Sequence, residues 1–411
     1  MSFQATWKLR TVLVPALLLV LSSGLSAQNS EAPPTFAADK IRGFKPAGEN
    51  YTIKNPVRSD GLFRVYTLAT PYGEFTVQGD LMLRMRLNEL AALAELEKLS
   101  QSEQYTKALV NAGLSPIKYA GKLIVNPVDT IQNTFAGVGS FLGSIGSGMA
   151  NAGKTQDDAL SSLIGVTRER RQLAAKLGVD PYTDFVPLAA KLKLLAEAAA
   201  LGGLTVTGAM MAIPGAAGIV VSNLSTANTL GDMRIEELAR NYTASQILDL
   251  NRQRLTAMGI DKNLTEALLM NRNYTPVDLA AMTAALESMG GVADRVVFVR
   301  RAASVNSRGN AYAMRKHAEM AAHYAKASGF TSFVSLGGFP FNMARDGAVV
   351  AVMPVDVISW TDTTARAFGE SSNDLKKIGR GGELRLTGTA TPLAKQRLKE
   401  LGWRVVENAR I

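Results

Sequence analysis

The longest uncharged stretch of the chain runs from Ala198 to Gly231. These 34 residues are rich in Ala, Gly and Thr, and Pro214 interrupts them near the middle. The stretch is long enough to cross a bilayer, which takes about 20 apolar residues in one helix. Because a proline breaks a helix, we predict that Ala198–Asn223 forms two short helices packed inside the protein. Insertion of this segment into a membrane is the alternative.

A second uncharged stretch, Thr130–Gly153, is interrupted by glycines rather than by proline. Its glycines, from Gly137 to Gly148, alternate with apolar side chains. In a helix, Gly139 and Gly143 would form a GxxxG pair that lets another backbone approach closely. The segment is therefore either a loop or a glycine-lined helix. As a helix, Gly137–Gly148 is a second point at which the protein could associate with a membrane.

Apolar residues recur at helical spacing over most of the remaining chain. In 80–99, Leu83, Leu87, Leu90 and Ala94 share one helix face, and most charged residues lie elsewhere. Glycine and proline end several of the periodic segments. The pattern predicts further helices at 102–111, 157–177, from 183 onward, and at 235–247, 248–258, 262–271, 276–289 and 294–327.

In two regions, apolar and polar residues alternate as they do in β-strands. Residues 61–77 contain two β-rich runs around a turn at 71–73, which predicts a β-hairpin. Phe330–Leu336 and Ala348–Met353 flank a turn with Gly347, and they predict a second hairpin.

The predicted fold class is mainly α with minor β: a helical body with a β-hairpin and a small C-terminal βαβ module. The C-terminal module follows from a strand-like, a helical and a second strand-like run. In order, the segments are a signal peptide (1–27), an extended arm (28–60), a mainly helical body with an N-terminal β-hairpin (61–328), a β-hairpin and short helix (329–375), and the βαβ module (383–411).

The N-terminus has the three parts of a secretory signal peptide. Lys8 and Arg10 form a basic region, Val12–Leu21 is apolar, and small residues ending at Ala27 precede the expected cleavage before Gln28. The apolar part is about ten residues long, shorter than a spanning helix needs. We therefore expect a periplasmic or secreted protein.

The chain contains no cysteine. An exported protein of this composition has no disulfides and no lipidated cysteine, and it uses neither thiol catalysis nor cysteine-ligated metals. The two histidines, His317 and His323, are six residues apart, so they diverge around a helix and could not easily share one metal ion. No phosphate-binding loop, dinucleotide loop or serine-hydrolase elbow is present. The sequence therefore predicts no cofactor and no metal.

Three residues are weak candidates for catalysis. Asp356 is an acid within an apolar run, where burial can raise the pKa of a carboxyl group. Glu319 and His323 share a helix face at i, i+4, a spacing that suits a general-base pair. The alternatives are an edge-strand or helix-capping role for Asp356 and packed or surface positions for the histidines. His317 lies on a face that has the composition of a core.

Positive charge is the main surface feature. The net charge of +10 becomes +8 when the signal peptide removes two basic residues and no acidic one. This balance suits an anionic envelope surface or a protein partner, whereas nucleic acid is not expected outside the cytoplasm. Arg301, Arg308 and Arg315 recur every seven residues and would form one stripe along a helix, which could bind phosphate groups. The alternative is a solvated face or a contact with acids such as Glu236 and Glu237.

Several short strings carry a resemblance to other proteins. From about Asn126 onward, the chain resembles an uncharacterised group of exported hypothetical proteins from Gram-negative bacteria. The resemblance supports the segment boundaries, but it transfers no catalytic residue and no ligand. The strings are LGVDPYTD (177–184), NRQRLTAMGI (251–260), MPVDVISWT (353–361) and LTGTATPLAKQRLKELGW (386–403).

Two functions are therefore expected. The first is an exported cell-envelope protein without enzymatic activity that binds a membrane or an envelope partner. The second is a periplasmic or secreted hydrolase that uses Asp356, Glu319 and His323. Clustering of these three side chains in one pocket would favour the hydrolase, and their dispersal would favour binding.

Overall fold

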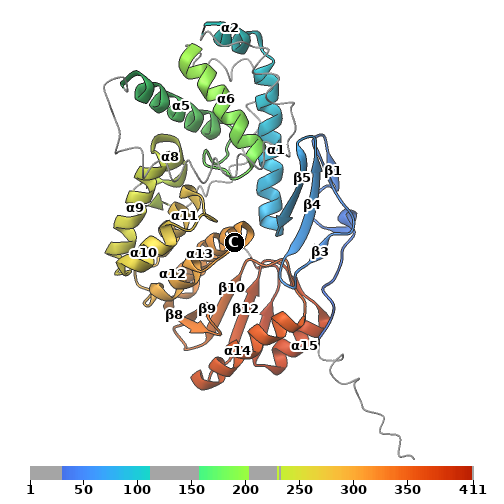
Figure 1. The fold of residues 1–411 in the computed structure, drawn as a ribbon. Coiled ribbons are helices and arrows are strands. Elements are labelled where there is room, and N and C mark those ends of the chain that lie inside the picture. Colours follow the sequence, from blue (N-terminus) through green and yellow to red (C-terminus); the bar gives the residue numbers. More distant parts are fainter. Residues whose placement is uncertain (1–29, 112–156, 203–228, 231–232, 410–411) are drawn as a thin grey trace, which may run out of the picture.

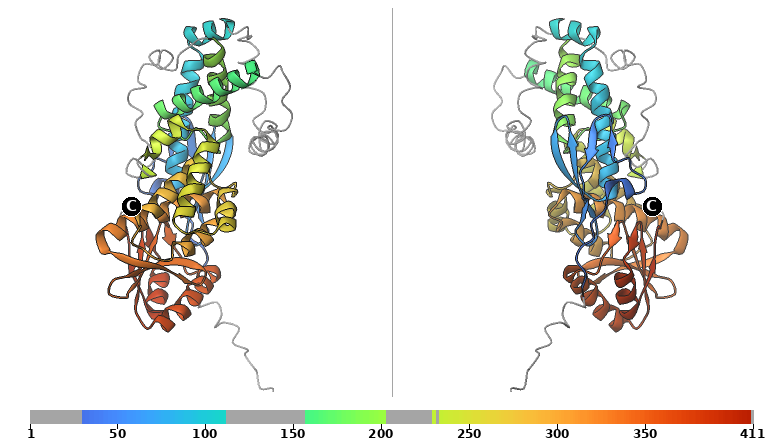
Figure 2. Two further views of the ribbon diagram at one scale, coloured as in Figure 1. Left: turned by 90° about the vertical axis from the view of Figure 1, so that its left-hand side faces the viewer. Right: turned by 90° about the vertical axis from the view of Figure 1, so that its right-hand side faces the viewer.

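A computed structural model describes residues 30–111, 157–202, 229–230 and 233–409. Over this part the chain is mainly α-helical with some β-structure, which confirms the predicted fold class at that level. An N-terminal sheet and a group of helices lie above a C-terminal sheet in Figure 1. The side views show an elongated molecule with helices at one end and the C-terminal sheet at the other (Figure 2).

The N-terminal sheet is built around the predicted hairpin, whose strands pair antiparallel across a tight turn. Residues 28–60, expected to be an extended arm, differ from that prediction because they supply three more strands of this sheet. These strands are two or three residues long, too short for an alternating pattern to be visible. The elements are a 3-10 turn (Ala38–Lys40), β1 (Ala47–Gly48), β2 (Tyr51–Ile53), β3 (Arg58–Ser59), β4 (Arg64–Thr70) and β5 (Gly73–Gln78).

The first of the next four helices lies beside this sheet and the other three lie farther from it (Figure 1), and Leu68 and Tyr66 of β4 share one hydrophobic core with all four. The N-cap of the first of these helices is Gly79, whose φ of 95° suits a glycine, and Asp80 is the first helical residue. The helices are α1 (Asp80–Ser100), α2 (Glu103–Asn111), α5 (Asp157–Lys176) and α6 (Val186–Gly202).

A second group of helices follows, joined by short turns. Side-chain caps start several of them; the Thr243 and Thr275 side chains form capping boxes with Gln246 and Asp278. The predicted helix 294–327 is two helices, because the chain turns between them and a serine caps the second. The elements are α8 (Ile235–Asn241), α9 (Ala244–Ala257), α10 (Lys262–Leu269), α11 (Pro276–Ser288), α12 (Arg295–Ala303) and α13 (Arg308–Ser328), preceded by β6 (Thr229–Leu230) and β7 (Met233–Arg234).

The C-terminal sheet has five strands in the order β14-β12-β10-β9-β8. The predicted second hairpin omitted β9, which pairs with both β8 and β10. Strands β10, β12 and β14 are parallel neighbours, so the described part of the predicted βαβ module, residues 383–409, continues the same sheet and does not form a separate module. The elements are β8 (Phe330–Leu336), β9 (Phe339–Ala344), β10 (Val349–Met353), β11 (Val357–Ile358), α14 (Asp362–Ile378), β12 (Gly382–Leu386), β13 (Thr389–Ala390), α15 (Pro392–Glu400) and β14 (Trp403–Val406).

Alternation along these strands separates two hydrophobic cores. Leu384 and Trp403 pack in one core with side chains of α14 and α15. Val350 and Val352 point to the opposite face, where they join the core formed by α9 to α13. The sheet is thus covered by α14 and α15 on one face and by the helical group on the other.

Candidate functional site

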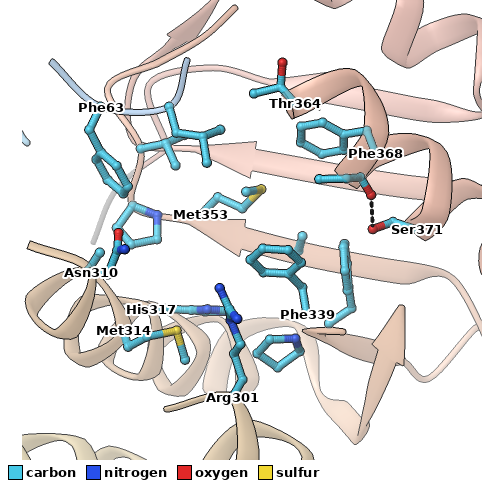
Figure 3. Close-up of a pocket in the computed structure, with 18 of the residues that line it drawn as sticks. Phe63, Arg301, Asn310, Met314, His317, Phe339, Met353, Thr364, Phe368 and Ser371 are labelled. Atoms are coloured by element: carbon cyan, nitrogen blue, oxygen red, sulfur yellow. Dashed lines mark hydrogen bonds between the residues drawn. The ribbon is translucent and has the colours of Figure 1, made fainter. Parts of the chain in front are cut away.

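An apolar pocket lies where β10 ends, between α12, α13 and α14 (Figure 3). Its cavity volume is about 250 Å³. In open sheets with parallel strands, ligands bind beyond the carboxyl ends of the strands. Here Met353 is the last residue of β10, and Pro354 and Val355 continue the pocket wall. The position in the fold therefore favours a ligand site.

Large apolar side chains from three elements line this pocket. Phe339 and Phe341 project from β9, Met314 projects from α13, and Phe368 projects from α14. Phe339 and Phe341 are two residues apart on one strand, so their side chains lie on the same face of the sheet. The pocket can therefore exclude water from the body of an apolar ligand.

His317 is one of the few polar groups in the pocket lining. Its side chain is 8% exposed, and its ring contacts the Phe298 ring edge-on at 5.2 Å between centroids. Burial lowers the pKa of His317 to about 4, so its imidazole is neutral near pH 7. Its Nε2 atom has no hydrogen-bond partner among the described residues. The sequence-based expectation that His317 faces a core is confirmed, but this core is open to a cavity.

Arg301 brings a positive charge to the same pocket. Its guanidinium lies over the Phe339 ring, 4.4 Å from the centroid. No ion pair joins Arg301 to a carboxylate in the described part of the chain, and its buried Nε has no hydrogen-bond partner there. An arginine keeps its charge at every pH that a protein experiences. Figure 3 shows Arg301 and His317 among the apolar side chains that line the pocket. The pocket thus combines an unneutralised cation with a neutral imidazole in apolar surroundings.

This arrangement suits an anion with an apolar body. A guanidinium can donate two parallel hydrogen bonds to a carboxylate, and charge-assisted bonds of this kind are about twice as strong as neutral ones. A neutral His317 can donate one further bond from Nε2 in the tautomer that carries its proton there. Buried polar atoms without partners are costly. A ligand that supplies acceptors to Arg301 and His317 removes that cost.

Asp356 lies beside the pocket, but its carboxylate is engaged elsewhere. It is 5% exposed and accepts hydrogen bonds from the backbone N–H groups of Arg64 (2.8 Å) and Asp80 (3.1 Å). Asp80 N–H is at the start of α1, so Asp356 satisfies a helix N-terminus. Burial and the nearby Asp80 charge raise the pKa of Asp356. The structure thus gives Asp356 a role in joining the two sheets.

Glu319 and His323 lie on α13 outside the pocket lining. Arg315 donates to one carboxylate oxygen of Glu319 at 2.9 Å, and Lys316 donates to the other at 2.7 Å. These cations lower the pKa of Glu319 despite its burial. His323 is exposed and contacts only the edge of a neighbouring tyrosine ring among the interactions described for it. None of the three catalytic candidates is among the residues that line this pocket.

The predicted arginine stripe is not present on the surface. Arg301 belongs to α12, whereas Arg308 and Arg315 belong to α13, so the seven-residue spacing does not run along one helix. Arg315 is 3% exposed, and Arg308 and Arg315 both form ion pairs with the buried Asp278, at 2.7 and 3.1 Å. The anion-binding interpretation of the stripe was wrong for these two residues. Their charges are neutralised inside the protein.

That Arg301 and His317 line the same pocket was missed by sequence reasoning. The two residues are on different helices, and the break between those helices was not predicted. A residue pattern that could have found it is Asn306-Ser307, a helix-capping signal placed inside the apparently continuous helix. Ser307 does cap α13, since its hydroxyl accepts from Asn310 N–H.

The membrane predictions concern residues that the structure mostly does not describe. Gly137–Gly148 lies outside the described residues, and of Ala198–Asn223 only the first five residues belong to α6. No helix in the described part combines the length and the apolar character that a membrane span requires. The described residues also contain no group of three or more His, Asp or Glu side chains placed to hold a metal ion.

Comparisons of this chain with protein-family models, with curated proteins and with solved structures gave no match. The resemblance to exported proteins of Gram-negative bacteria therefore remains an expectation from the sequence.

Proposed function

We propose that this protein is a non-enzymatic binding protein for a small amphipathic anion, held in the pocket between α12, α13 and α14. The observation that carries the proposal is the pair of unpartnered nitrogen atoms, Arg301 Nε and His317 Nε2, in an apolar pocket. The anionic group lies at these nitrogens. The apolar body of the ligand lies against Phe339, Met353 and Phe368.

The size of the cavity restricts the ligand. A cavity of about 150 Å³ admits benzene, and small-molecule pockets begin near 300 Å³. The pocket, at about 250 Å³, lies between these values. A short-chain or aromatic carboxylic acid is the ligand class that fits both this volume and a single guanidinium.

Export remains part of the proposal. The signal-peptide pattern of residues 1–27 supports a periplasmic or secreted location, where a cysteine-free chain has no thiols to be oxidised. Association with a membrane through Ala198–Asn223 or Gly137–Gly148 is compatible with the same role. A hydrolase is not proposed, since both Glu319 oxygens are bonded to cations and Asp356 accepts from two backbone N–H groups.

The test compares carboxylates with alcohols of the same shape. Calorimetric titration of the full-length mature protein with phenylacetate and hexanoate is set against 2-phenylethanol and hexanol. Arg301→Gln should weaken carboxylate binding by about tenfold to a hundredfold, the range expected when a charge-assisted hydrogen bond is lost. Binding of the alcohols should change little.

Two further variants separate the pocket from general effects of charge and folding. Arg300→Gln removes an exposed charge from the same helix and should leave both ligand classes unaffected. Ala313→Leu fills the pocket from α13 and should weaken both classes. The proposal is wrong if the acids bind no better than the alcohols, or if Arg301→Gln and Arg300→Gln have equal effects.

A further inference from the structure

A second cavity, of about 420 Å³, lies on the C-terminal sheet at the opposite end of β10. It is lined by the start of β10 and by the turn before it, whereas the apolar pocket is lined by the residues that end β10. Three arginines line the cavity: Arg345, Arg385 and Arg404. Two acids, Asp346 and Glu383, leave one excess positive charge among the lining residues.

Strand register places three of these charged residues on one face of the sheet. Glu383 lies opposite Val350 of β10 on one side and Arg404 of β14 on the other. Arg385 is two residues beyond Glu383 on β12, so it points to the same face. This is the face that the helical group covers at β10. At β14 it reaches solvent, where the Arg404 side chain is 70% exposed.

Two of the three arginines share one acid, and the third is held by a different contact. Arg385 and Arg404 both form ion pairs with Glu383, and the Arg385 guanidinium also lies 4.8 Å from the centre of the Tyr324 ring. Arg345 packs on Gly329 at the end of α13, where a Cβ atom would come within 2.7 Å of its Nε. The missing side chain of Gly329 therefore makes room for the Arg345 guanidinium beside the negative end of the helix.

The cavity has guanidinium groups that the acids among the described residues do not neutralise and that can donate hydrogen bonds to an anion. Arg345 forms no ion pair with any described residue. Glu383 can neutralise only one of its two arginines. A further cation, Arg380, lies beside the turn, with Nε 3.5 Å from the position that a Cβ on Gly347 would take. Guanidinium forks match phosphate oxygens, and a phosphate offers several acceptors and up to two charges to such a cluster.

We propose that the cavity lined by Arg345, Arg385 and Arg404 binds a phosphate group, either of a soluble phosphate ester or of a lipid headgroup. Glu383 positions Arg385 and Arg404 and competes with the phosphate for them. This site is independent of the apolar pocket, because the two share no lining residue.

The experiment uses the full-length mature protein with two kinds of probe. Inorganic phosphate and glycerol 3-phosphate test a soluble ligand. Vesicles of phosphatidylglycerol, compared with vesicles of phosphatidylcholine, test a headgroup. Arg345→Gln and Arg404→Gln should each weaken binding by about tenfold or more, while Arg58→Gln, at an exposed position of β3, should not. Glu383→Gln should strengthen binding, because it removes the competing charge.

The outcomes are distinct. Binding of the soluble phosphates with this variant pattern assigns the site to a phosphate ester, and the same pattern with vesicles alone assigns it to a lipid headgroup. Absence of binding to every probe overturns the proposal. An equal loss with Arg58→Gln also overturns it, since binding would then follow net charge. If an arginine variant lowers thermal stability, the gain expected from Glu383→Gln decides, and a loss there contradicts the site.

Discussion

Replacement of Arg315 by glutamine tests the assignment of this residue to the interior. Arg315 donates to Asp278 at 3.1 Å and to Glu319 at 2.9 Å, and the Asp278 side chain is 1% exposed. These carboxylates raise the pKa of Arg315, so the guanidinium is charged in the folded protein. In Arg315→Gln, Asp278 keeps only Arg308 and Glu319 keeps only Lys316 as cationic partners.

The expected loss of unfolding free energy in Arg315→Gln follows from the burial of the ion pairs. Breaking a buried ion pair by removing one partner costs about 3–5 kcal/mol, because the remaining charge is left in an environment of low polarity. The cost here is expected near the lower end of that range, since each acid retains one cation. Arg300→Gln is the matched control: Arg300 is exposed, and surface substitutions of this kind change stability by about 0.5 kcal/mol or less.

Urea denaturation followed by circular dichroism measures the difference. Arg315→Gln should lower the transition midpoint with an unchanged slope, whereas Arg300→Gln should leave the midpoint in place. Binding to anionic vesicles should be the same for wild type and for Arg315→Gln. A variant with wild-type stability and reduced vesicle binding would refute the buried position and restore the surface stripe.

The remaining predictions concern pH and export. Because burial lowers the pKa of His317 to about 4, below the value of about 6.5 in an unfolded chain, the unfolded state binds the proton first as the pH falls. His317 therefore destabilises the protein progressively between about pH 6.5 and pH 4, and His317→Leu should lose less unfolding free energy than wild type over this interval; parallel pH profiles from denaturant titration would contradict this. Expression with the intact N-terminus should yield a protein outside the cytoplasm that begins at Gln28, as N-terminal sequencing would show; an exported form that begins at Met1 would disprove cleavage.

Most helices could be predicted because their sequence signals are local. The repeat of Leu83, Leu87 and Leu90 gave a helix at 80–99, and α1 spans Asp80–Ser100. Short β-strands are harder to predict from the sequence. β9 contains Pro340, which argues against a central strand, yet the strand pairs on both sides. The Gly337-Gly338 turn before it is a hairpin signal that could have placed β9 beside β8.

Charged residues show why the candidate site was less predictable than the fold. Arg301, Arg308 and Arg315 have equal spacing and the same chemistry in the sequence, but they differ in the carboxylates that reach them. Arg308 and Arg315 meet Asp278, and Arg308 also meets Asp184, at separations of 30 residues or more along the chain.

Arg301 is the member of this set that meets no carboxylate among the described residues. Helix periodicity cannot distinguish it, because periodicity describes one helix and ion pairing depends on which helices become neighbours. A charged side chain next to an apolar pocket indicates a ligand site only if no carboxylate of the protein neutralises it. Arg315 is a structural arginine because Asp278 and Glu319 neutralise it, whereas the Arg301 guanidinium has no carboxylate beside it among the described residues and is the one that we propose binds a ligand.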